Sequence, residues 1–177
     1  MSSIWKIYWV VVFVTVANYL IMILWSLPLL TEITGGVIPF DLRPGGYTFG
    51  EALVFLEAIN ESGRSFYLNT QHTLDFFYPM LFATSVAIPL VYLMPSYFGW
   101  PMAAIALGAA VFDYLENNAV AAMIKTAPGD LTEAMVSTAS NWTLAKSILT
   151  TIASVALLVV LCIKGINWFK SRSNQAV

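Results

Sequence analysis

The chain has 177 residues, of which 59% are hydrophobic and only 10% are charged, whereas soluble domains carry roughly 25% charged residues. The length indicates a single domain, residues 1–177, and the composition excludes an ordinary water-soluble one. A net charge of −2 provides no basic surface, which makes nucleic acid a poor partner.

The chain contains one cysteine, Cys162, and one histidine, His72. An internal disulfide needs two cysteines, and zinc and haem sites use several cysteine or histidine ligands. We therefore expect no disulfide, no zinc and no haem within one chain.

Residues 4–27 form the first long apolar run. Runs longer than ~18 residues are typical of transmembrane helices, and this one is too long for a signal peptide. Aromatic side chains near its ends suit the membrane interfaces, and we expect Pro28 to end the helix.

The loop that follows, residues 28–65, is rich in glycine and proline. Thr48 with Glu51 three residues later matches a capping box that opens a helix. Apolar side chains recur on one face of residues 49–60, which predicts a short amphipathic helix lying on the membrane surface or over the bundle.

Three further spans are predicted at residues 66–94, 100–124 and 142–168. Pro79 and Pro89 should kink the second span or free backbone carbonyls for neighbouring helices. A separate short helix from Asp130 and a cap at Asn141 should precede the fourth span. The predicted fold is all-α: an integral membrane four-helix bundle with a short amphipathic helix in the first extracytoplasmic loop.

Four spans place both termini on one side of the membrane. The basic residues on that side have no acidic residue among them: Lys6, Lys164, Lys170 and Arg172. By the positive-inside rule, both termini are predicted to be cytoplasmic, in a multi-pass protein of the cell's inner membrane.

The most informative stretch is residues 111–120, in the middle of the third span. Asp113, Glu116 and Asn117 are three and four residues apart, so they share one helical face. A charged group at bilayer depth costs ~2.5–3.5 kcal/mol. Such a cost points to a functional site or to polar packing between helices.

The other spans place polar residues at a similar depth. Counted from the loop side at 1.5 Å per residue, Asn117 lies ~12 Å deep and Asp113 ~18 Å. Asp75 lies roughly 12–16 Å deep, Asn18 about 14 Å and Lys146 about 8 Å. This common level predicts one polar pocket that opens to the extracytoplasmic side and is covered by the 49–60 helix.

We take Asp75, Asp113 and Glu116 as the candidate catalytic residues, for proton transfer or for metal binding. Three acids in a low-dielectric pocket cannot all ionise without a cation, so at least one is expected to hold a proton. A metal is the alternative neutraliser, and an all-oxygen ligand set suits Mg²⁺, Mn²⁺ or Ca²⁺. The candidate ligand-binding residues are Asn18, Arg64, Gln71, His72, Asn117 and Lys146.

Three short motifs carry a resemblance: Gly63-Arg64-x-x-Tyr67, Leu74-Asp75-x-x-x-Pro79 and Asp113-x-x-Glu116-Asn117. Over residues 40–160 they resemble the pattern of a type of small bacterial four-span membrane protein, which implies site positions but no activity. In layout alone the chain is similar to the EXPERA four-helix membrane proteins, which hold acidic residues in a pocket for sterol-like ligands. That likeness implies a fold and a type of site.

The sequence favours a protein that binds or transforms a hydrophobic or amphiphilic small molecule, with membrane lipids around it. Two alternatives stay open: a small proton-coupled transporter acting as a homo-oligomer, and an accessory or assembly subunit of a membrane complex. Acids that face one another inside the monomer would favour ligand binding, outward-facing acids a subunit, and a polar path through the bundle a transporter.

Overall fold

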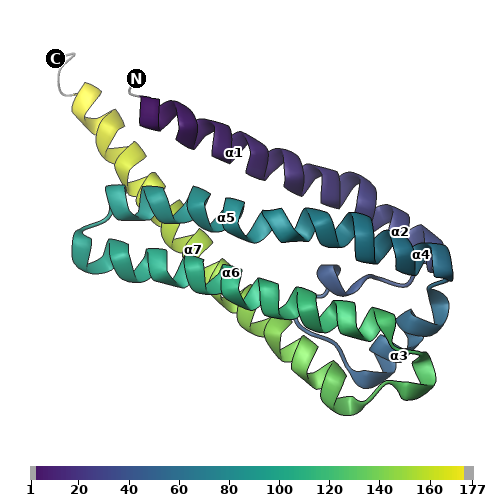
Figure 1. Ribbon diagram of the computed structural model, residues 1–177. Coiled ribbons are helices and arrows are strands. Elements are labelled where there is room, and N and C mark those ends of the chain that lie inside the picture. Colours follow the sequence, from purple (N-terminus) through teal and green to yellow (C-terminus); the bar gives the residue numbers. More distant parts are fainter. Residues whose placement is uncertain (1–2, 174–177) are drawn as a thin grey trace.

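The computed structural model describes residues 3–173, and every regular element in that range is helical. Four continuous helices are long and apolar enough to cross a membrane: Ser3–Ile33, Glu61–Leu93, Ser96–Lys125 and Glu133–Ser173. They run up and down side by side, so the first turns of the first helix and the last turns of the fourth lie at one end (Figure 1). We call that the terminal end, and the opposite end, with the longer connections, the loop end.

The first long helix extends past Pro28, where the sequence predicted its end. It consists of α1 (Ser3–Ile21), the π-helical turn η1 (Met22–Ser26) and α2 (Leu27–Ile33). Proline lacks an N–H and disturbs the usual helical pairing, and directly before it the wider turn lets the Leu27 N–H bond the Met22 carbonyl. The helix ends where Gly35 and Gly36 adopt φ values of 66° and 100°, the left-handed conformation common after helices.

The second long helix also contains a wide turn. Its parts are α4 (Glu61–Phe66), the π-helical turn η3 (Tyr67–Gln71) and α5 (His72–Leu93). The two wide turns meet, because the Ser26 hydroxyl of η1 donates a hydrogen bond to the side-chain oxygen of Gln71 in η3. Single π turns are frequent at functional sites.

The short helix α3 (Phe49–Ala58) begins with the predicted capping box of Thr48 and Glu51, which is confirmed. Its apolar face is not left on a surface, since Phe55 and Leu56 are only 0% and 1% exposed in the core of the loop end. The helix ends at Ala58, before the predicted residue 60, because Asn60 caps α4 instead.

The third and fourth long helices are longer than predicted. Helix α6 (Ser96–Lys125) begins directly after Pro95, which places Pro101 inside it. Helix α7 (Glu133–Ser173) is continuous over 41 residues, so the predicted separate helix and the cap at Asn141 are wrong. No proline or glycine lies between Glu133 and Asn141, and asparagine alone does not end a helix. The turn η4 (Pro128–Asp130) joins α6 to α7.

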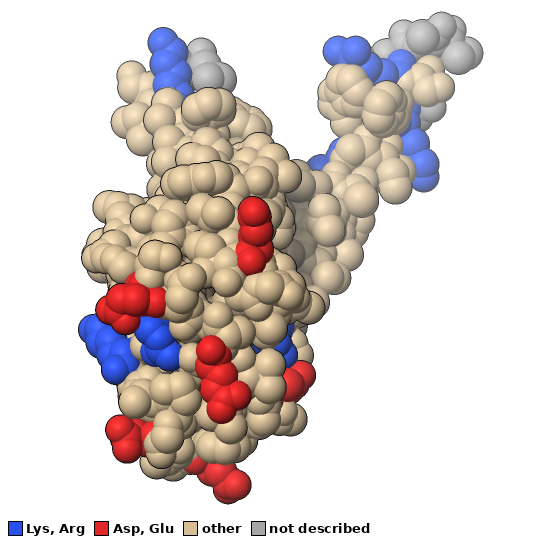
Figure 2. Space-filling model, turned by 90° about the vertical axis from the view of Figure 1, so that its right-hand side faces the viewer, with Lys and Arg blue, Asp and Glu red and all other residues tan. Residues whose placement is uncertain are grey.

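Packing leaves one side of the bundle open. Helix α5 packs against α1, α6 and α7, and α6 packs against α7, while α1 does not pack along α7. Figure 2 shows the two diverging as separate arms toward the terminal end. At the loop end, the turn η2 (Phe40–Leu42) comes between the first and the fourth long helix, since its Asp41 and Leu42 line one cavity with residues of both.

The outer surface of the long helices is apolar. In the first long helix only 11% of the most apolar stretch is buried inside the protein, and the same share is buried in the fourth. Large side chains such as Phe13 (73% exposed) and Leu24 (72%) point outward. An exposed apolar surface of this extent is typical of helices that face lipid or a partner in the membrane.

Candidate functional site

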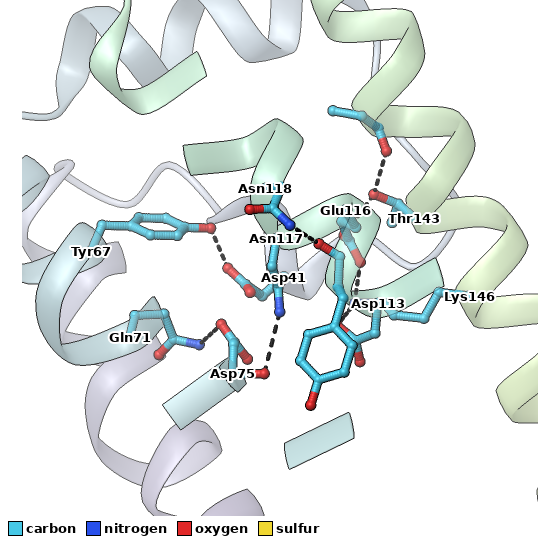
Figure 3. A network of polar contacts seen from close by, with 12 residues as sticks. Asp41, Tyr67, Gln71, Asp75, Asp113, Glu116, Asn117, Asn118, Thr143 and Lys146 are labelled. Carbon is cyan, nitrogen blue, oxygen red and sulfur yellow. Dashed lines mark hydrogen bonds and ion pairs between the residues drawn. The ribbon is translucent and has the colours of Figure 1, made fainter. Parts of the chain in front are cut away.

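The acidic residues of α6 face the inside of the bundle. Glu116 is 2% exposed, and Asp113 and Asn117 are also buried. Their shared helical face, predicted from the spacing, turns toward α5 and α7 (Figure 3). Thus the acids face other helices of the same chain, and they are not presented to an external partner.

Helix α7 supplies the positive charge. The Lys146 ammonium forms an ion pair with Glu116 and lies 3.5 Å from an oxygen of Asp113. The Thr143 hydroxyl, one turn earlier on α7, donates a hydrogen bond of 2.6 Å to the other oxygen of Glu116. One lysine is therefore shared by two buried acids.

Asp75 lies on α5, and none of the ion pairs among the described residues includes it. The Gln71 side-chain amide donates a hydrogen bond of 2.8 Å to Asp75 Oδ2 (Figure 3). Gln71 is itself fully buried and accepts the hydroxyl proton of Ser26. The two π turns thus hold Gln71 in place against the acid.

Prolines in α5 expose carbonyls that other helices bind, as the sequence predicted. Pro79 has no N–H for the carbonyl of Asp75 four residues earlier, and that carbonyl accepts the Asn117 amide at 3.3 Å. Pro89 likewise leaves the Ser85 carbonyl free, and it accepts the Tyr8 hydroxyl at 3.1 Å. Asn18 donates to the Leu74 carbonyl at 3.0 Å, so Asn18 and Asn117 both bond to the α5 backbone at the site.

A fourth acid, Asp41, joins the site and was missed in the sequence analysis. It lies in η2, which Phe40 holds in the core at 1% exposure, and it accepts a hydrogen bond from the Tyr67 hydroxyl of η3. The feature of the sequence that could have predicted this position is the apolar segment 37–42 inside an irregular loop. Burial of such an apolar segment favours a loop that folds back into the bundle, and Asp41 lies within the segment.

The acids line a common cavity of about 200 Å³. Asp41, Asp75, Asp113 and Lys146 reach it from η2, α5, α6 and α7, and apolar residues of the first helix, with Tyr19, form the opposite wall. The predicted convergence of Asp75 with the Asp113–Glu116 turn is therefore confirmed. No residue of α3 lines this cavity, so η2, not the predicted 49–60 helix, closes it toward the loop end.

Arg64 and His72 do not join these acids. Both line a separate, open groove of about 780 Å³ between the start of the second long helix and the end of α6. The Arg64 guanidinium donates to the backbone carbonyls of Leu56, Ile124 and Thr126, which satisfies the ends of α3 and α6. The groove is larger than the acidic cavity, but only the cavity collects several inward-facing acids.

Tyr47 is a second residue that sequence reasoning did not identify. It is 7% exposed, and its hydroxyl has no hydrogen-bond partner among the described residues. Burial raises the pKa of Tyr47 above its usual value, and the nearby charge of Glu116 raises it further. The loop therefore adds a neutral hydroxyl beside Glu116 and Thr143.

The carboxyl groups do not form a ready metal cage. Within residues 3–173 no three acidic, histidine or cysteine side chains are close enough together to hold a metal ion. A Mg²⁺, Mn²⁺ or Ca²⁺ ion bound by Asp75, Asp113 and Glu116 would need these side chains to move. Without such movement, the arrangement suits proton exchange between acids or binding of a cation in the cavity.

Comparisons with protein-family models, with curated proteins and with solved structures find no match to this chain. The likeness to small four-span bacterial proteins and to the EXPERA layout therefore stays a prediction from motifs and helix order. The site has to be interpreted from its own geometry.

Proposed function

We propose that this chain is a multi-pass membrane protein that binds or transforms a hydrophobic or amphiphilic small molecule in its acidic cavity. One observation carries the proposal: Asp41, Asp75, Asp113 and Lys146 come from four different elements and line the same cavity. Small-molecule sites are typically concave, mostly apolar and equipped with a few convergent polar groups.

The energy cost of this arrangement supports a functional role. Buried ion pairs are seldom better for stability than well-packed apolar residues of similar volume. Here one lysine stands against four acids, Asp41, Asp75, Asp113 and Glu116. Neutral residues would join four helices at lower cost, so ligand binding or proton transfer explains the excess of acids better than packing does.

The direction of the acids favours ligand binding over the two alternatives. An assembly subunit would present its acids to a partner helix, whereas Asp75, Asp113 and Glu116 are buried within the monomer. A carrier needs a polar path to the terminal end. The hollow at that end, between Trp5 and Tyr92, is lined almost entirely by apolar side chains.

If the protein is an enzyme, the geometry suggests roles for the three candidate acids. Asp75 and Asp113 line the cavity, so either can exchange a proton with a bound molecule. Glu116 lies behind them, and its ion pair with Lys146 would hold the ammonium beside Asp113. Paired carboxyl groups in different surroundings are the usual equipment for acid and base catalysis.

We infer that both termini lie in the cytoplasm and that the loop end lies on the extracytoplasmic side of the inner membrane. The support is the charge pattern: Lys and Arg without acids mark both arms of the terminal end, and acids gather near the loop end (Figure 2). Such asymmetry follows the positive-inside rule.

Mass spectrometry of small molecules that copurify with the protein tests the proposed function. The wild-type protein, Asp113→Asn and Glu116→Gln are purified in the same uncharged detergent, with Asp130→Asn in the exposed η4 turn as the control. We expect an amphiphile that is enriched with wild type and control and depleted at least severalfold in both site variants.

Equal recovery from all four proteins would contradict the proposal, and so would no enrichment over an unrelated membrane protein. Circular dichroism of each preparation separates loss of ligand from loss of fold.

A further inference from the structure

The cavity has two sides that differ in charge compensation. Lys146 contacts Glu116 and lies within 3.5 Å of Asp113. On the other side, Asp41 and Asp75 lie within hydrogen-bonding reach of each other, and each also accepts a hydrogen bond from a neutral group, Tyr67 and Gln71 respectively. No ion pair within residues 3–173 includes Asp41 or Asp75.

An apolar groove lies next to the cavity on α7. It has a volume of about 450 Å³ and runs under Pro44 and Gly45 past Leu144, Ile148 and Ile152. Ser147 lines both the groove and the cavity. Ile148 is 51% exposed on this face of α7.

We propose that the site takes a single-tailed amphiphile with a small protonated amine head, which enters sideways from the membrane. The amine lies in the cavity against the Asp41–Asp75 pair, and the tail lies in the groove on α7. This inference rests on the proposed function and adds the class of ligand to it.

The charge of the head follows from the residues that would surround it. An ammonium group gives Asp41 and Asp75 the cation that neither has in the chain, and charge-assisted hydrogen bonds are about twice as strong as neutral ones. An anionic head would face both carboxylates and be repelled. A cavity of about 200 Å³ also limits the head to a small group.

Three probes with one tail length test the ligand class. Dodecylamine, dodecanol and dodecanoate are titrated into the full-length protein in phosphatidylcholine nanodiscs, with empty nanodiscs to correct for partition into lipid. We expect dodecylamine to bind about tenfold to hundredfold more tightly than the other two. Asp41→Asn and Asp75→Asn should each abolish most of this preference, and Glu57→Gln, an exposed acid of α3, should retain it.

The tail is tested separately. Ile148→Trp fills the groove and should weaken binding of dodecylamine at least severalfold. Ile163→Trp, a matched change at another exposed site of α7, should have no effect. Because Ile148 lies on the surface, this variant is informative even if the aspartate variants fail to fold.

The outcomes separate the two proposals. Equal binding of dodecanol or dodecanoate, or a preference that survives both aspartate variants, overturns the amine head and leaves the proposed function standing. Unchanged binding in Ile148→Trp overturns the position of the tail. If none of the three probes binds above the empty nanodiscs, both proposals fail.

Discussion

The two ends of the bundle are held together differently. The core of the loop end contains large side chains, among them Phe40, Phe55 and Tyr67, together with the loop and α3. The core of the terminal end consists of Val86, Leu90, Ala106 and Ala153. Beyond this small core, α1 and α7 separate (Figure 2).

The two ends differ because they bury different kinds of side chains. The loop end encloses several acids and a lysine, and buried polar groups need rigid partners at fixed positions. The core of the terminal end is built from apolar and small residues, and in lipid such helices associate by close approach and not by a hydrophobic driving force. The side chains that need fixed polar partners are thus concentrated around the cavity.

The largest effect is expected from Phe55→Ala in α3. Phe55 is fully buried against Phe40 and Tyr67, and loss of a buried phenylalanine costs about 3–5 kcal/mol. Phe13→Ala, on the exposed face of α1, should change stability by less than about 0.5 kcal/mol. Unfolding in mixed detergent and sodium dodecyl sulfate measures both, and equal losses would contradict the contrast between the ends.

Next in size is Lys146→Met. It leaves Asp113 and Glu116 without their cation, and breaking a buried ion pair costs about 3 kcal/mol or more. Lys164→Met, on an exposed position near the terminal end, is the matched control and should be close to neutral. The same unfolding experiment applies. If Lys146→Met were as stable as its control, the acids would already be neutral in the folded protein.

A smaller loss is expected from Gly99→Ala at the terminal end. A Cβ there would come within 2.9 Å of the Leu90 carbonyl oxygen and 3.2 Å of the Val91 Cα, both backbone atoms. Overpacking of this kind costs about 1–3 kcal/mol. A Cβ at Gly165 meets nothing within 4 Å, so Gly165→Ala should be neutral or slightly stabilising. Equal stability of the two variants would show that close approach at Gly99 is unimportant.

The smallest effect is expected at the capping box. Thr48→Ala should cost about 1 kcal/mol. Hydrogen bonds from the Thr48 N–H and hydroxyl lower the pKa of Glu51 below its usual 4.5. A lowered pKa in the folded state gives stability that is present above pH 4.5 and is lost as pH falls through the lowered value. Glu51→Gln should therefore reduce the pH dependence of unfolding in this range, and an unchanged pH profile would contradict the assignment.

The sequence predicted much of the fold because its signals are local. Runs of apolar residues indicated four helices, and Thr48 with Glu51 indicated where α3 begins. Predictions of helix ends were less accurate, because they relied on single residues such as Pro28 and Asn141. Proline was accommodated by the wide turn of η1, and asparagine was incorporated into α7.

Candidate site residues were predictable where helical periodicity applied. The depth of Asp75, Asp113 and Lys146 follows from counting along helices, and they do meet in one cavity. Asp41 lies in an irregular loop, where counting gives no depth. Arg64 and His72 were predicted to bind the ligand beside Asp75, but both line the other groove, between the start of the second long helix and the end of α6.

By itself, the sequence determined that this chain forms long apolar helices with acids at a common level, because burial in a low-dielectric medium constrains composition and period along each segment. Only the tertiary structure decided which acids share a cavity and that Asp41 completes it. Those facts depend on how helices rotate and pack against one another, and such contacts join residues that are far apart in the chain.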